Sequence, residues 1–164
     1  YGAHVSSRTP LGVVCLKAGD AMASGDTFEI EIIGSGGHAA APHLTIDPLV
    51  VGSQILLNLQ PIVSRQVDPT DSAVVSVTSF NGGDSFNVIP DSATLKGTVR
   101  TFDEKVRDSI EQSIRKIAKL AGEAMGADIH FKYVKGYPNG QGRLRLLLKR
   151  SSGDIFSCWR KTRG

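Results

Sequence analysis

The sequence predicts an α+β fold in which four strands and two helices follow one another in the order β-α-β-β-α-β. Several short segments alternate apolar and polar residues, which is the period of a half-buried strand. Two longer segments repeat apolar residues every three or four positions, as amphipathic helices do. This order is that of the ferredoxin-like fold, a four-stranded antiparallel sheet with two helices on one face and a polar open face.

A glycine-rich break separates the first strand from the first helix. Residues 26–33, DTFEIEII, alternate apolar and polar side chains, and residues 34–42 interrupt this pattern with glycines and a proline. Asp47 and Pro48 are then the residue types that cap and open a helix. Pro61 falls inside the helical pattern, where it lacks an N–H donor and clashes with the preceding turn. A kink or an end of the helix is therefore predicted just before it.

The second half of the pattern repeats the first. A strand is predicted over residues 73–80, and SATLKGTVRTF, residues 92–102, alternates again. Asp103 is a typical N-cap for a helix with apolar residues three or four positions apart, and Gly126 is a typical stop. Alternation over residues 129–133 predicts the last strand.

Composition places the chain among ordinary globular proteins. Its 164 residues fit one domain, and the apolar fraction of 40% and the charged fraction of 21% are typical. No apolar run approaches the roughly 18 residues of a membrane span, and no signal-peptide pattern opens the chain, so a cytoplasmic location is expected. Cys15 and Cys158 are too few and too far apart in the sequence for a disulfide framework or a Cys-x-x-Cys metal site.

The distribution of charge and of Gly, Ser and Pro residues divides the chain into three parts. Residues 141–164 hold seven Lys or Arg against one Asp, so the tail carries a charge of +6 while the whole chain carries +3. We expect residues 1–25 to be a remnant of another domain, because Gly, Ser and Pro punctuate them before the first strand. Residues 26–136 form the predicted fold. Residues 137–164 show neither a helical nor a strand period, which favours a disordered or foreign basic tail.

The break after the first strand, GSGGHAAAPH, displays two histidines. It matches a loose dinucleotide-binding pattern, but Pro42 intervenes and the helix begins too late for its N–H groups to meet a pyrophosphate. Neighbouring residues offer too few ligands for a closed zinc site around His38 and His43. Loop histidines that bond to backbone are the plain interpretation. The flanking glycines instead favour a backbone that a ligand can approach.

Asn87, in FNVIP, and Arg100, in GTVR, are the other candidate site residues. An Asn before an apolar run is commonly a turn residue, and an Arg on an open strand face is commonly solvated. By themselves these two residues therefore indicate no function.

Several motifs together resemble those of the metal-dependent amidohydrolase/peptidase family that contains auxin-conjugate hydrolases, hippurate hydrolase and N-acetyl-diaminopimelate deacetylase. The resemblance runs over residues 1–138. Its motifs are GAHVSSRTPLG, MASGDTFEIEI, GSGGHAAAPH, DPLV, LQPIVSRQVDP and GGDSFNVIPDSATLKGTVRTF. Enzymes of this family have a two-metal catalytic domain interrupted by a ferredoxin-like lid that also forms the homodimer. This chain resembles the lid and the short catalytic-domain segment before it.

The resemblance implies a role for each candidate. His38 would reach the active site of the partner subunit and stabilise the tetrahedral oxyanion. Asn87 and Arg100 would contact the substrate, also in trans, and the planar guanidinium would pair with its free carboxylate. His4 matches a metal-binding histidine, but the other expected ligands are absent from the sequence. The resemblance therefore implies zinc or manganese in the full-length enzyme, and no bound metal or activity in this chain alone.

The leading hypothesis is a lid and dimerisation segment of a metal-dependent amidohydrolase that cleaves N-acyl amino acids or related amide conjugates. One alternative is an RNA-binding module, because RNA-recognition domains share this strand order, although the third strand offers Thr and basic residues where those domains carry exposed aromatics. The other is a ligand-sensing or purely dimerising module without catalysis. The hypothesis predicts a homodimer and no binding to nucleic acid or membranes.

Overall fold

The computed structural model describes residues 7, 10, 13–17, 19–142 and 156–160. The chain divides into two compact units, one formed by residues 1–22 and 140–164 and the other by residues 23–139. We describe each unit by itself.

The smaller unit contains two antiparallel strand pairs. β1 (Val13–Lys17) pairs with β10 (Phe156–Arg160), and the register places Cys15 opposite Cys158 although the two are distant in the sequence. β2 (Gly19–Met22) pairs with β9 (Gly140–Gly142). Local sequence patterns predict none of these strands. The origin assigned to residues 1–25 and 137–164 stays a prediction, and residues 143–155 and 161–164 lie outside the described part of the tail.

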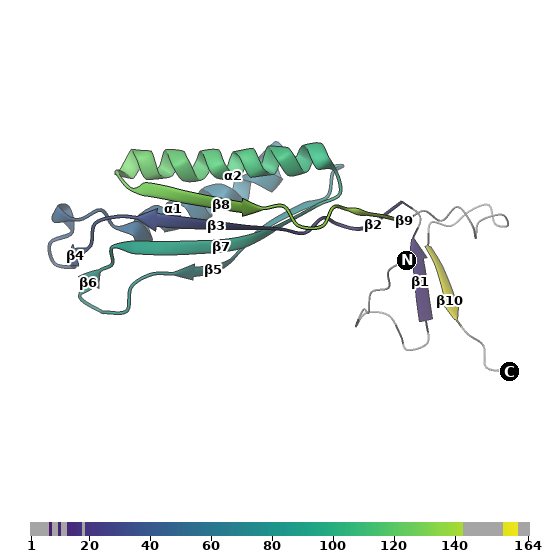
Figure 1. The fold of residues 1–164 in the computed structure, drawn as a ribbon, viewed down its shortest axis with the longest axis horizontal. Helices are drawn as coiled ribbons and strands as arrows, with labels where there is room; N and C mark the ends of the chain where they lie inside the picture. The colour runs from purple at the N-terminus through teal and green to yellow at the C-terminus, as the bar shows by residue number, and fades with distance from the viewer. Residues whose placement is uncertain (1–6, 8–9, 11–12, 18, 143–155, 161–164) are drawn as a thin grey trace. The chain divides into compact units, whose positions relative to one another are not determined.

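The larger unit has the predicted ferredoxin-like fold (Figure 1). Its sheet is antiparallel and has the strand order β5-β7-β3-β8. The bounds of these strands are Asp26–Ile33 for β3, Ala73–Asn81 for β5, Ser92–Thr101 for β7 and Asp128–Val134 for β8. Helices α1 (Pro48–Pro61) and α2 (Glu104–Met125) cover one face of this sheet. The predicted fold class and element order are therefore confirmed.

The core lies between the helices and the sheet. Alternate residues of β3 and β7 face it, and one side of each helix closes it. The side chains that are at most 1% exposed include Ile30, Ile32, Leu95, Val99, Val51, Ile55, Leu59, Ile110 and Ile114. Because burying one such aliphatic side chain contributes about 1.5–3 kcal/mol, the alternating and helical patterns together supply the main driving force of folding.

Both helices begin and end where the sequence predicts. The Asp47 carboxylate accepts hydrogen bonds from the N–H groups of Leu49 at 2.8 Å and Val50 at 3.4 Å. α1 ends at Pro61 and the chain continues into a π-helical turn, Ile62–Gln66. The carboxylate of Asp103 caps α2, which ends at Gly126 with a left-handed φ of 76°. Among the described residues, no helix is long and apolar enough to cross a membrane.

Two short strands join the loops at one end of the sheet. β4 (Gly37–His38) and β6 (Val88–Ile89) pair with each other, and a 3-10 turn, Pro42–Leu44, follows β4. Figure 1 shows both strands beyond the end of β3 and the start of β7. Two residues are too few to show an alternating period, so the sequence does not predict this ladder.

Candidate functional site

Close backbone packing shapes the loop that carries His38. The N–H of Gly34 donates to the Asp91 carbonyl at 2.8 Å, and the N–H of Gly36 donates to the Asp91 carboxylate at 2.9 Å. A Cβ atom at Gly36 would lie only 2.4 Å from the Ile89 carbonyl oxygen. Glycine is therefore required there because the strand after the turn approaches too closely for a side chain.

His38 is exposed at the end of β4. Its Nδ1 accepts a hydrogen bond of 3.0 Å from the Ala40 N–H. A ring nitrogen that accepts carries no proton, so the neutral imidazole holds its proton on Nε2. The Nε2–H group is consequently a hydrogen-bond donor on an exposed side chain.

Asn87 lies next to His38. The Asn87 carbonyl accepts from the Ala39 N–H at 3.0 Å, and His38 stands opposite Val88 in the β4–β6 ladder. The side-chain oxygen of Asn87 accepts from the Ser85 hydroxyl at 3.2 Å. That contact orients the amide, and its NH₂ group remains a donor. The structure thus brings His38 and Asn87 together at one end of the sheet.

Arg100 lies at the opposite end. It follows Val99, which is opposite Asp26, whereas Ser92 at the other end of β7 is opposite Ile33. Arg100 is eight positions after Ser92 on β7, which corresponds to about 26 Å at about 3.3 Å per residue. Within one chain the structure therefore does not unite Arg100 with His38 and Asn87.

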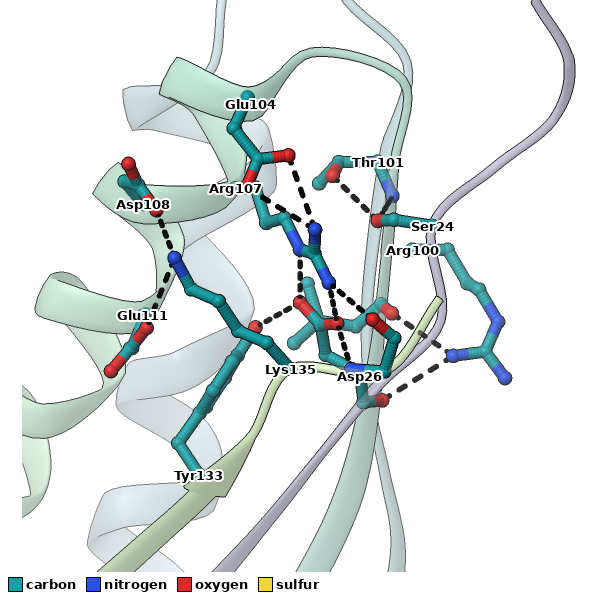
Figure 2. Close-up of polar contacts among 12 residues, drawn as sticks. Ser24, Asp26, Arg100, Thr101, Glu104, Arg107, Asp108, Glu111, Tyr133 and Lys135 are labelled. Carbon is teal, nitrogen blue, oxygen red and sulfur yellow. Dashed lines mark hydrogen bonds and ion pairs between the residues drawn. The ribbon is translucent and has the colours of Figure 1, made fainter. Parts of the chain in front are cut away.

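A buried ion pair beside Arg100 was not predicted from the sequence. The Arg107 guanidinium binds the Asp26 carboxylate through Nε at 2.8 Å and Nη2 at 2.5 Å, and the two side chains are 5% and 0% exposed. Tyr133 donates its hydroxyl to the same carboxylate at 2.8 Å, and the Gly136 N–H donates at 3.0 Å. Figure 2 shows that Arg107 on α2 and Tyr133 on β8 both point toward Asp26 on β3.

These contacts shift the titration of all three side chains. Burial alone would raise the pKa of Asp26, but the hydrogen bonds from Arg107, Tyr133 and Gly136 outweigh it and hold the pKa below 3.8. The hydrogen bond to Asp26 raises the pKa of Arg107. Burial, followed by the hydrogen bond to Asp26, raises the pKa of Tyr133. The cluster is therefore a charged, hydrogen-bonded pair near neutral pH.

The same cluster joins the places where the chain enters and leaves the larger unit. The Gly25 N–H donates to the Tyr137 carbonyl at 3.1 Å, and the Ser24 N–H donates to the Thr101 carbonyl at 2.7 Å. The Arg107 Nη2 also donates to the Gly136 carbonyl at 3.2 Å. α2 is in this way fixed to both crossing segments.

The metal-binding candidate, His4, lies outside the described residues. Within the described ranges, no group of three or more His, Cys, Asp or Glu side chains could hold a metal ion. His43 is exposed in the 3-10 turn, and His130 lies 3.1 Å from Glu31 on the open sheet face. The described residues thus contain no cluster that could form a metal centre.

Comparison with known proteins gives the family context. The family profile described as "Peptidase dimerisation domain" (M20_dimer) matches residues 24–125. An N-acyl-L-amino acid amidohydrolase of Geobacillus stearothermophilus is 41% identical over 94% of this chain and 45% of its own length. Hippurate hydrolase of Campylobacter jejuni is 49% identical over 73% of this chain and 31% of its own length.

A solved structure agrees in fold. The Bacillus subtilis YXEP protein, described as a dinuclear metal-binding peptidase of the M20 family, matches with a TM-score of 0.62 and 35% identity. The match covers 84% of this chain and 33% of that one. The chain therefore spans less than half the length of these relatives.

Proposed function

The chain belongs to the peptidase dimerisation-domain family of M20 amidohydrolases, and from this premise we propose that it serves a longer, metal-dependent amidohydrolase. The substrates would be N-acyl amino acids or related amide conjugates, as the names of the Geobacillus and Campylobacter relatives suggest. A divalent metal pair, zinc or manganese, would belong to the catalytic domain, with His4 as one ligand. The observation that carries this proposal is the match over residues 24–125.

His38 and Asn87 would act on a substrate held by another polypeptide. Both are exposed, and both present a hydrogen-bond donor at the tip of the sheet. His38 would donate from Nε2 to the oxyanion that forms when a metal-activated water attacks the amide carbonyl. The Asn87 amide would support the same end of the substrate.

Arg100 would bind the free carboxylate of the substrate at the other end of the sheet. A guanidinium matches a carboxylate with two parallel N–H groups. Because Arg100 lies far from His38 within one chain, we propose that one active site takes His38 and Asn87 from one subunit and Arg100 from its partner. This revises the expectation that all three residues act in trans.

A two-fold axis beside β5 would produce this combination. Antiparallel pairing of β5 with its copy places the Asn81 end of one strand beside the Ala73 end of the other. The Ala73 end is the end of Arg100, which pairs with Val74. The Asn81 end leads into the loop of β6. The His38 tip of each subunit would thus meet the Arg100 end of its partner.

The β5 side of the unit suits such a contact. β5 is an edge strand of nine residues without a charge or a proline, and α1 also has no charged residue over its 14 positions. Val50, Leu57 and Val74 are 52%, 63% and 51% exposed on these two elements. The other edge, β8, carries Asp128, His130 and Lys132, which protect an edge from pairing. We therefore propose a homodimer through β5 and α1.

Hydrolysis of N-acetyl and N-benzoyl amino acids tests the proposed function. The chain alone, with added zinc or manganese, is expected to give no turnover, whereas the full-length protein should hydrolyse both substrates. His38→Ala in the full-length protein should lower kcat by about 10²–10³-fold while the dimer persists in sedimentation, because one oxyanion donor is lost. Turnover by the chain alone, or full activity of the variant, would contradict the proposal. Full activity of the variant would instead favour a module without catalysis.

A further inference from the structure

The guanidinium of Arg100 is held on one side only. Its Nη1 donates to the Thr98 hydroxyl at 2.5 Å, to the Val99 carbonyl at 3.0 Å and to the Asp26 carbonyl at 3.3 Å. Within the described part of the chain, Nε and Nη2 of Arg100 make no hydrogen bond. Nε and Nη2 form the edge with two parallel N–H groups, which Arg107 uses to bind the Asp26 carboxylate. Arg100 thus presents a free edge of the kind that binds carboxylates.

The Thr98 hydroxyl fixes which edge is free. It donates its single proton to the Asp26 carbonyl at 2.8 Å, so its lone pairs remain to accept from Arg100 Nη1. Thr98 and Arg100 are two residues apart on β7 and therefore share the open face of the sheet. Without the hydroxyl, Nη1 would lose its shortest contact, and rotation of the guanidinium would be less restricted.

Asp26 gives this arrangement a rigid base. Its carbonyl accepts from both Thr98 and Arg100, while its carboxylate is bound on the other face by Arg107, Tyr133 and Gly136. Figure 2 shows Arg100 and Arg107 approaching Asp26 from opposite sides. The acceptor that Thr98 and Arg100 share is therefore anchored by a buried ion pair rather than by a loop.

From this geometry we infer that Thr98 is a positioning residue for a carboxylate-bearing substrate. Its hydroxyl occupies Nη1 of Arg100 and so directs the Nε–Nη2 edge toward the carboxylate. The inference rests on the proposed role of Arg100. It predicts that selectivity for a free carboxylate depends on a hydroxyl at position 98 as well as on the guanidinium.

The test compares an acid with its amide in the full-length protein. The substrates are N-acetyl-methionine and N-acetyl-methioninamide, which differ only in the carboxylate. Thr98→Val should raise KM for the acid about tenfold, the order expected for one lost hydrogen bond to a charged group, with kcat changed less than about twofold. The ratio of kcat/KM for acid over amide should fall by the same factor. Thr98→Ser, which keeps the hydroxyl, should restore both values to within about twofold of the unmodified protein.

Two further variants separate the possible failures. Thr94→Val is the matched control, because Thr94 is also half-buried on the open face of β7 but four residues away, and it should leave the ratio unchanged. Arg100→Met should collapse the ratio, and an unchanged ratio there would overturn the proposed role of Arg100. If Arg100→Met collapses the ratio while Thr98→Val leaves it unchanged, or weakens acid and amide equally, the inference about Thr98 is wrong.

Discussion

Asp26 carries a full negative charge on the helix-facing side of β3, where its neighbours in the alternating pattern are apolar. Removing a carboxylate from water is costly unless a partner and hydrogen bonds compensate. Here Arg107 supplies a two-pronged contact, and Tyr133 and the Gly136 N–H occupy the remaining positions. The mutual attraction of Asp26 and Arg107 therefore adds little net stability to the fold. Removing one partner would still be costly, because the other charge would stay buried without compensation.

Arg107→Met should lower the free energy of unfolding by about 3–5 kcal/mol, because the Asp26 carboxylate stays buried without a partner. Urea unfolding followed by circular dichroism measures the change. Lys119→Met is the matched control on the same helix: its pair with Glu123 at 3.6 Å is exposed on both sides and should be worth at most about 1 kcal/mol. Equal effects of the two substitutions would contradict the prediction.

The lowered pKa of Asp26 also predicts an acid dependence of stability. A carboxyl whose pKa is lower in the folded state binds fewer protons there than in the unfolded chain. Its contribution is therefore complete above the ordinary value of 3.8 and is lost as the pH falls through the folded pKa below it. The urea concentration at the midpoint of unfolding should decrease as the pH falls below about 4. The Asp26→Asn variant should be less stable at every pH, but its midpoint should decrease less over the same pH range. The same slope in both proteins would refute the assignment.

For single residues, the sequence predicts which side chains are candidates for a site but not which side chains they contact. His38 and its glycines are recognisable locally, and close packing at Gly36 confirms that the loop needs glycine. Asp26 and Arg107 each occupy a position on the apolar face of their element. Two opposite charges at such positions were the available sequence signal for a buried ion pair. Nothing local indicates that two charges 81 residues apart neutralise each other.

At the scale of elements, α1 and β5 differ from the rest of the unit. α2 is strongly amphipathic, with charged residues on its outer side, whereas α1 is uncharged on both sides. A surface helix without charged residues is typical of a helix that is covered by a partner. The uncharged β5 edge beside it extends the same surface.

Leu57→Lys on α1 should convert the dimer to a monomer, because it places an unpaired charge in an apolar contact. The dissociation constant should rise roughly 100-fold or more. Leu120→Lys, on α2 and exposed to 52%, is the matched control and should leave the dimer intact. Sedimentation equilibrium of both variants distinguishes the outcomes. The reverse pattern would assign the contact to α2.

Element positions follow from local patterns where a period extends over five or more residues. β3, β5, β7, β8 and both helices are of this kind. β4 and β6 pair with each other but are too short to show a period. β1 and β10 pair with each other although they come from opposite ends of the chain, so no local pattern could reveal their pairing. The π-helical turn after Pro61 buries Ile62, and no local pattern predicts it.

For the whole molecule, the opposite placement of His38 and Arg100 predicts complementation between inactive subunits. His38→Ala and Arg100→Met should each abolish most activity in the full-length protein. A mixed dimer of the two would contain one site with both changes and one site with neither. Mixing equal amounts should therefore restore about a quarter of the activity, because half of the dimers are mixed and each has one intact site.

No recovery after confirmed subunit exchange would show that His38 and Arg100 serve the same site from the same chain. A mixture of unmodified protein with the doubly substituted variant is the control. In its mixed dimers every active site contains one substituted residue. Subunit exchange should therefore lower the activity of the mixture below the summed activities of the two proteins measured separately. Exchange can be followed with two affinity tags. The sequence could not predict that His38 and Arg100 lie at opposite ends of the sheet, because only the strand registers reveal which residues share an end.

The hydrogen bond between Gly25 and Tyr137 has an evolutionary consequence. Residues 23–139 begin and finish at neighbouring points, because the Gly25 N–H donates to the Tyr137 carbonyl. A segment whose ends are adjacent can be inserted into another domain with little change to that domain. A longer enzyme could gain, lose or exchange such an inserted segment without a change in the path of its other strands. Swapping this segment between related hydrolases should consequently transfer subunit recognition as one inherited piece.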